Sequence, residues 1–175
     1  MLVLFGSITM LFGASIVGYL ITRLQNDIWK TASMPGLPLG LFASTALLAV
    51  LSVAMHRALA AVRENRFERL QACLMLALLF GLAFILGQAL NWRAMYAATT
   101  ATDARTLYGF TFYMLTGLHA LHVIGGFVPL CVAINKARRR EYSSSNHEGV
   151  KLITQYWDYL GGVWLVLVGV LYFAT

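Results

Sequence analysis

Long apolar stretches alternate with short polar ones along the whole chain. A helix rises about 1.5 Å per residue and needs about 20 apolar residues to cross about 30 Å of hydrocarbon. Five stretches reach that length, with predicted bounds of 1–22, 37–57, 70–92, 106–135 and 152–175. Each must satisfy its own backbone groups in lipid, so all five are expected to be helices. The pattern predicts an all-α integral membrane bundle of five transmembrane helices, with residues 1–175 forming a single membrane domain.

Basic residues are distributed unevenly among the connections between these spans. The connections after the second and fourth spans hold nine of the 13 lysines and arginines, and the other two connections hold four. Lysine and arginine resist transfer across a membrane, so the basic connections are expected in the cytoplasm. The count predicts a cytoplasmic N-terminus and a C-terminus on the outer side, which is the periplasm in a bacterium.

The composition is unlike that of a soluble or a disordered protein. Hydrophobic residues make up 59% of the chain and charged residues 11%, against about 45–50% and about 25% in soluble domains. The net charge of +6 comes mainly from the basic connections, so we expect no nucleic-acid partner. Arg138, Arg139 and Arg140 either attract anionic lipid headgroups or only stop translocation. Cys73 and Cys131 are too few for a disulfide framework or a zinc site.

Polar residues of the fourth span gather on one helix face. At about 100° per residue, this face carries Tyr108, Thr116, His119, His122 and Gly126. Since polar groups are costly in lipid, we expect the face to contact protein. His119 and His122 lie one turn apart and serve either as hydrogen-bonded packing residues or as two ligands of a metal or haem. The second role needs further ligands at the same depth, so we favour the first.

The third span carries a second polar face, made of Gly81, Phe84, Gln88, Asn91 and Trp92. Hydrogen bonds between membrane helices contribute roughly 0.6 to 2 kcal/mol each. We therefore expect Gln88 and Asn91 to form structural hydrogen bonds with the fourth helix. Trp92 lies near the end of its span, where aromatic side chains are enriched.

The fifth span has two distinct faces. One face carries Thr154, Asp158, Gly161, Gly162, Gly169 and Tyr172, and the other carries Trp157, Trp164, Val168 and Leu171. Small residues let helices approach closely, so we expect the first face to pack within the bundle and the second to face lipid or a partner. Asp158 lies about six residues, or roughly 9 Å, inside the span. It is either a proton relay or, as we favour, a residue at headgroup level paired with His147 or an arginine.

Composition and spacing alone predict no catalytic, cofactor-binding or metal-binding residues. The combination of blocks, however, resembles subunit III of the haem-copper terminal oxidases. The stretch YGFTFYMLTGLHALHVIGG resembles the family pattern T-G-x-H-x-x-H-V with paired glycines, and GLAFILGQALNW is similar to G-x-x-F-L-x-x-Q-x-x-E-W. His147, Gly149, Tyr156, Trp157 and Trp164 match H-x-G followed by Y-W-H-F-x-D-x-x-W.

Several positions depart from the family pattern. Ser7, Met10 and Phe12 match the S-E-x-M-F-F helix, yet Ile8 stands where the family carries a buried glutamate. Asn91 replaces a glutamate, Asp158 a histidine and Gly161 an aspartate. The chain thus resembles a divergent member in the short, five-helix bacterial form.

The resemblance implies a non-catalytic subunit of a cytochrome c oxidase in the bacterial inner membrane. Such a subunit packs against catalytic subunit I, with subunit II and small subunits as further partners. The partner subunits bind the haem and copper. Subunit III itself binds phospholipid between its helices and supports proton uptake and oxygen access. The alternatives are a subunit III relative in a quinol oxidase or nitric oxide reductase, and a haem-binding membrane cytochrome that uses His119 and His122.

Overall fold

The computed structural model describes residues 2–25, 38, 40–98 and 107–173. These residues form the helices α1 (Leu2–Leu24), α2 (Gly40–Arg63), α3 (Phe67–Ala98), α4 (Leu107–Arg138) and α5 (Glu148–Phe173). All five are long and apolar enough to cross a membrane. The predicted all-α architecture of five transmembrane helices is therefore confirmed.

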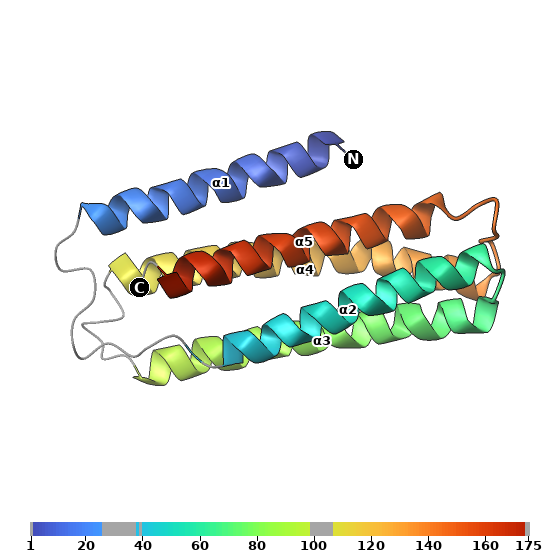
Figure 1. The fold of residues 1–175 in the computed structure, drawn as a ribbon. Helices are drawn as coiled ribbons and strands as arrows, with labels where there is room; N and C mark the ends of the chain where they lie inside the picture. Colours follow the sequence, from blue (N-terminus) through green and yellow to red (C-terminus); the bar gives the residue numbers. More distant parts are fainter. Residues whose placement is uncertain (1, 26–37, 39, 99–106, 174–175) are drawn as a thin grey trace.

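The helices lie side by side in an elongated bundle (Figure 1). Helices α2 and α3 form one antiparallel hairpin, and α4 and α5 form another. The two hairpins meet through α3 against α4 and through α2 against α5, while α1 packs against α4 and α5. Helix α5 therefore contacts α1, α2 and α4.

Four helices extend beyond the predicted apolar stretches at the basic end of the bundle. Helix α2 continues to Arg63, α3 begins at Phe67, α4 continues to Arg138, and α5 begins at Glu148. A helix satisfies its own backbone groups in any solvent, so the chain stays helical after it leaves the hydrocarbon. Helix α1 begins on the side of the α2–α3 and α4–α5 turns, and α5 ends on the other side (Figure 1). The assignment of the basic end to the cytoplasm stays a prediction.

The core is built from large rings on the face of α5 that we expected to meet lipid or a partner. Trp157, Trp164 and Leu171 are buried, whereas an added Cβ at Gly161 or Gly162 would find no atom within 4 Å. The predicted glycine seam within the chain was therefore wrong. Lipid tails are as apolar as these side chains, so dispersion contacts decide which face turns inward, and the larger rings gain more of them.

The close approach between α4 and α5 occurs instead at Gly126. A Cβ added to Gly126 would lie 2.8 Å from Cε1 of Tyr156 and 3.2 Å from Cζ2 of Trp157. The hydroxyl of Tyr156 donates a hydrogen bond to the backbone carbonyl of His122 at 2.8 Å, which holds the ring in place. Gly126 thus leaves room for two rings of the neighbouring helix.

This contrast gives a matched pair of glycine substitutions. Gly126→Ala is expected to destabilise the protein by about 1 to 3 kcal/mol, because the new methyl group forces Tyr156 and Trp157 to move. Gly162→Ala is expected to be neutral or to stabilise the helix by up to about 1 kcal/mol, the helix propensity gained. Chemical unfolding of both variants in detergent micelles measures the difference. Equal stability of the two variants would contradict the packing described for α4 and α5.

Candidate functional site

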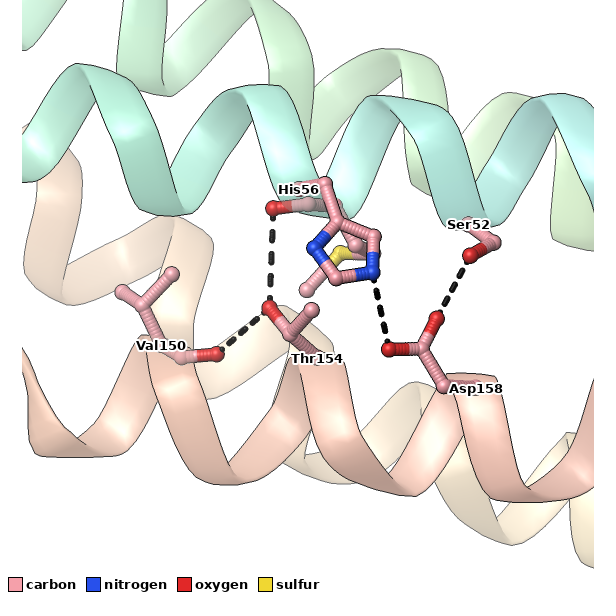
Figure 2. Close-up of polar contacts among 6 residues, drawn as sticks. Ser52, His56, Val150, Thr154 and Asp158 are labelled. Atoms are coloured by element: carbon pink, nitrogen blue, oxygen red, sulfur yellow. Dashed lines mark hydrogen bonds and ion pairs between the residues drawn. The ribbon is translucent and has the colours of Figure 1, made fainter.

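A cluster of polar side chains joins α2 to α5 (Figure 2). Oγ of Ser52 donates a hydrogen bond to Oδ1 of Asp158 at 2.5 Å. Nε2 of His56 lies 2.9 Å from Oδ2 of the same carboxylate. One turn away, Oγ1 of Thr154 lies 2.9 Å from the carbonyl oxygen of Val150 and 3.5 Å from that of Met55. We call Ser52, His56, Thr154 and Asp158 the α2–α5 polar cluster.

The partner of Asp158 differs from the prediction. We expected His147 or an arginine, but Asp158 pairs with His56, and Nδ1 of His147 lies 2.7 Å from the carbonyl oxygen of Ser144. The cause is the length of α2. Because the helix runs on to Arg63, His56 lies within the helix and faces α5 rather than ending a span.

Asp158 lies well inside α5. It follows Glu148, the first residue of α5, by ten positions, which corresponds to about 15 Å of helix. Its position relative to the lipid headgroups stays a prediction. An ionised carboxylate inside the hydrocarbon costs several kcal/mol unless it is paired. The imidazole of His56 and the hydroxyl of Ser52 therefore lower the free-energy cost of the carboxylate at this position.

The cluster borders a hollow on the outer surface of the bundle. The side chains of Asp158 and His56 are 34% and 60% exposed, and the hollow between α2 and α5 has a volume of about 340 Å³. Its lining residues include Thr45, Ser52, Asp158, Gly162 and Trp164. A carboxylate and an imidazole therefore lie together at the edge of this hollow.

Trp164 links this hollow to the interior of the bundle. Its Nε1 donates a hydrogen bond to Oγ1 of Thr45 at 3.0 Å. On its inner side, the indole lies against the His119 ring, with 5.0 Å between the ring centroids, and meets Phe84 edge-on at 5.1 Å. His119 also lies near Phe12, at 6.1 Å between centroids. The structure thus surrounds His119 with aromatic rings from three helices.

The second histidine of the fourth helix has a different environment. Nδ1 of His122 lies 2.8 Å from the carbonyl oxygen of Leu118 on its own helix, and the ring lies 5.1 Å from that of Phe12. Within the part of the chain that the structure describes, no three His, Cys, Asp or Glu side chains gather as around a metal ion.

The polar residues of α3 divide their contacts between two helices. Nε1 of Trp92 donates a hydrogen bond to Oγ1 of Thr116 on α4 at 3.0 Å, and this bond joins the third and fourth spans. Asn91 instead reaches α2, where its Nδ2 lies 3.4 Å from Oγ of Ser44. Gln88 is buried, yet its amide has no protein partner among the described residues. The expected bonds from Asn91 and Gln88 to the fourth helix are therefore absent from this described part.

Sequence reasoning overlooked Ser52 and Thr45, and it did not predict the contact of His56 with α5. Ser52 and His56 are four residues apart in a helical stretch, a spacing that puts two polar side chains on the same face. That signal was available once α2 was taken to continue past Arg57.

The basic end of the bundle carries a second hollow, of about 410 Å³. Its lining residues are Arg66, Phe67, Glu68, Arg69 and Arg140. The guanidinium of Arg140 lies 5.8 Å from the centroid of the Phe67 ring, and Nε of Arg66 pairs with Glu64 at 3.0 Å. Three guanidinium groups around one hollow suit an anionic ligand.

Comparison with known proteins places the chain among oxidase subunits. Residues 9–175 match the family model described as cytochrome c oxidase subunit III. Similar proteins, all named cytochrome c oxidase subunit 3, come from Synechocystis (30% identity over 90% of this chain), Spodoptera frugiperda (33% over 61%) and Oryctolagus cuniculus (32% over 71%). The matches span 66%, 70% and 46% of the lengths of those relatives. With nearly all of its residues covered by the family model, the chain belongs to the cytochrome c oxidase subunit III family.

Proposed function

We propose that the chain is a non-catalytic subunit of a respiratory haem-copper oxidase of the cytochrome c oxidase type, in a bacterial inner membrane. The family match over residues 9–175 carries this proposal. In it, catalytic subunit I is the direct partner, subunit II and small subunits complete the complex, and the haem and copper are bound by those partners. The chain stabilises subunit I and takes part in aerobic electron transport through the assembled complex.

The α2–α5 polar cluster supports a protein partner on that side of the bundle. Hydrocarbon offers no hydrogen bonds, so an exposed carboxylate and imidazole at membrane depth are expensive to leave against lipid. A partner helix that covers the hollow beside Asp158 and His56 removes that cost. We therefore assign the contact with subunit I to the surface formed by α2 and α5.

Purification from native membranes tests the assignment to an oxidase. An affinity-tagged chain, extracted in mild detergent, is expected to carry with it a haem-copper catalytic subunit and the absorption bands of its haem. The sequences of the co-purified subunits separate a cytochrome c oxidase from a quinol oxidase or a nitric oxide reductase. Recovery of the chain without any haem-copper subunit would overturn the proposal.

The absorption spectrum of the isolated chain tests the membrane cytochrome alternative. His119 is packed among the rings of Phe12, Phe84 and Trp164, which favours a packing role over haem ligation. The isolated chain is accordingly expected to show no Soret band. A Soret band that disappears in His119→Ala would favour the cytochrome.

Two further roles belong to this proposal. The Asp158–His56 pair is suited to passing a proton toward the complex, which is how we propose that the chain supports proton uptake. An apolar hollow of about 490 Å³ lies between α1 and α5, lined by Phe12, Ile16 and Val163 among others. Molecular oxygen is apolar, so this hollow offers it a path toward the partner subunit.

Phospholipid binding is proposed at the arginine-lined hollow of the basic end. Each basic residue near an anionic membrane surface contributes about 1 kcal/mol, or roughly fivefold in affinity. Arg69→Gln together with Arg140→Gln is therefore expected to lower retention of anionic phospholipid roughly 25-fold. Native mass spectrometry of the purified complex counts the retained lipids. Arg93→Gln, near the other end of α3, is the control, and equal lipid loss in control and test variants would refute this site.

A further inference from the structure

Two fully buried polar side chains on the adjacent helices α3 and α4 have no direct hydrogen bond to each other. Gln88 on α3 and His119 on α4 are 1% and 0% exposed. Among the residues that the structure describes, neither the amide nitrogen and oxygen of Gln88 nor the two ring nitrogens of His119 have a protein partner. Four buried atoms that can form hydrogen bonds therefore have no protein partner among the described residues.

Two contacts between α3 and α4 place these side chains at the same level of the bundle. Nε1 of Trp92 bonds to Thr116, and the Phe84 ring lies 5.7 Å from the His119 ring, centroid to centroid. Gln88 lies four residues from both Phe84 and Trp92 and so shares their helix face. It is therefore bracketed opposite the segment from Thr116 to His119.

The surroundings define what kind of ligand suits these atoms. The rings of Phe12, Phe84 and Trp164 enclose His119 and carry no charge. An amide offers donors and an acceptor, and a neutral imidazole offers one of each. The ligand must be small and uncharged, and must both donate and accept hydrogen bonds. Water meets these conditions, since buried waters typically bond to two to four polar groups.

We propose that Gln88 and His119 bind an internal water molecule that bridges α3 and α4. An unpartnered buried polar group destabilises a fold by roughly 1 to 3 kcal/mol, so one water that serves both side chains removes a cost on each helix. The bridge also determines which ring nitrogen of His119 carries the proton. The inference concerns only the interior of this chain and does not depend on the proposed function.

A density map of the purified complex at a resolution that shows ordered waters is the direct test. The expected result is a peak within hydrogen-bonding distance of both the Gln88 amide and the His119 ring. A map with the two side chains bonded directly to each other, or with no peak between them, would overturn the proposal.

A double-mutant cycle gives an independent test. In Gln88→Leu or His119→Phe, the water loses one partner and the remaining polar group is left unsatisfied, so each variant is expected to unfold at a lower temperature. The double variant has neither group and is expected to unfold at a higher temperature than the sum of the single shifts predicts. Additive shifts would overturn the bridge.

Gln71 provides the control for this cycle. Its Nε2 donates to the carbonyl oxygen of Ala137 at 3.0 Å, so it also joins α3 to α4, but 17 residues and about 25 Å of helix away from Gln88. Gln71→Leu and His119→Phe are expected to combine additively. Coupling as large as that between Gln88 and His119 would show that the cycle reports general loosening of the helix pair, and would count against the bridge.

Discussion

Trp164→Ala is expected to lower the free energy of unfolding of the bundle by about 3 to 5 kcal/mol. The indole is completely buried and is the side chain through which α5 contacts three other helices. Its removal ends the hydrogen bond to Thr45 and the ring contacts with Phe84 and His119. The space that remains adjoins the hollow between α2 and α5, and the dispersion contacts of the indole with Phe84 and His119 are lost.

The neighbouring residue supplies the control. Leu165 follows Trp164 on the same helix but is 59% exposed, so Leu165→Ala removes contacts mainly with the surroundings of the bundle. Its effect on the isolated chain is expected to stay within about 0.5 kcal/mol. Pulse proteolysis in detergent micelles compares the two variants without depending on tryptophan fluorescence. Similar losses for Trp164→Ala and Leu165→Ala would contradict the inward orientation of the tryptophan face.

His56→Leu is expected to have the second largest effect, because it leaves the Asp158 carboxylate without its ion-pair partner. Breaking a fully buried pair costs about 3 to 5 kcal/mol. The Asp158 and His56 side chains are 34% and 60% exposed, so we expect a smaller loss, of about 1 to 3 kcal/mol. The double variant His56→Leu with Asp158→Leu removes the stranded charge and is expected to recover most of this loss. The same proteolysis assay measures both variants.

Asp158→Asn separates the structural role of the pair from its role with protons. Asparagine keeps an acceptor for the Ser52 hydroxyl and a donor for the His56 ring, so the bundle and its complex are expected to assemble normally. It cannot exchange a proton, so we expect the reconstituted oxidase to take up protons severalfold more slowly. Unchanged proton uptake would remove Asp158 from the relay while leaving its structural role intact.

The number and type of the helices followed from the sequence because bilayer thickness sets the length of an apolar helix. The polar face of the fourth span was also readable, since Thr116 and His119 are indeed buried. Hydropathy did not predict which face of α5 turns inward, because the inward face is set by the large buried rings of Trp157 and Trp164 and not by the polar or small residues of the opposite face.

The candidate site depended on where α2 ends. The first arginine after the apolar stretch suggested that the second span ends at Arg57, one residue after His56. The helix continues for six further residues, to Arg63. That extension brings His56 over α5, a contact between residues 102 positions apart in the chain that no local pattern encodes.

The order in which α2 and α5 are synthesised has a consequence for biogenesis. Ribosomal synthesis runs from the N-terminus, so His56 and Ser52 enter the bilayer before Asp158 leaves the ribosome. An aspartate near the centre of a helix opposes insertion by about 2.5 to 3.5 kcal/mol. The imidazole of His56 and the hydroxyl of Ser52, which are already in the membrane, offset that penalty when α5 inserts. Asp158 thus enters the membrane next to partners on α2 that were synthesised before it.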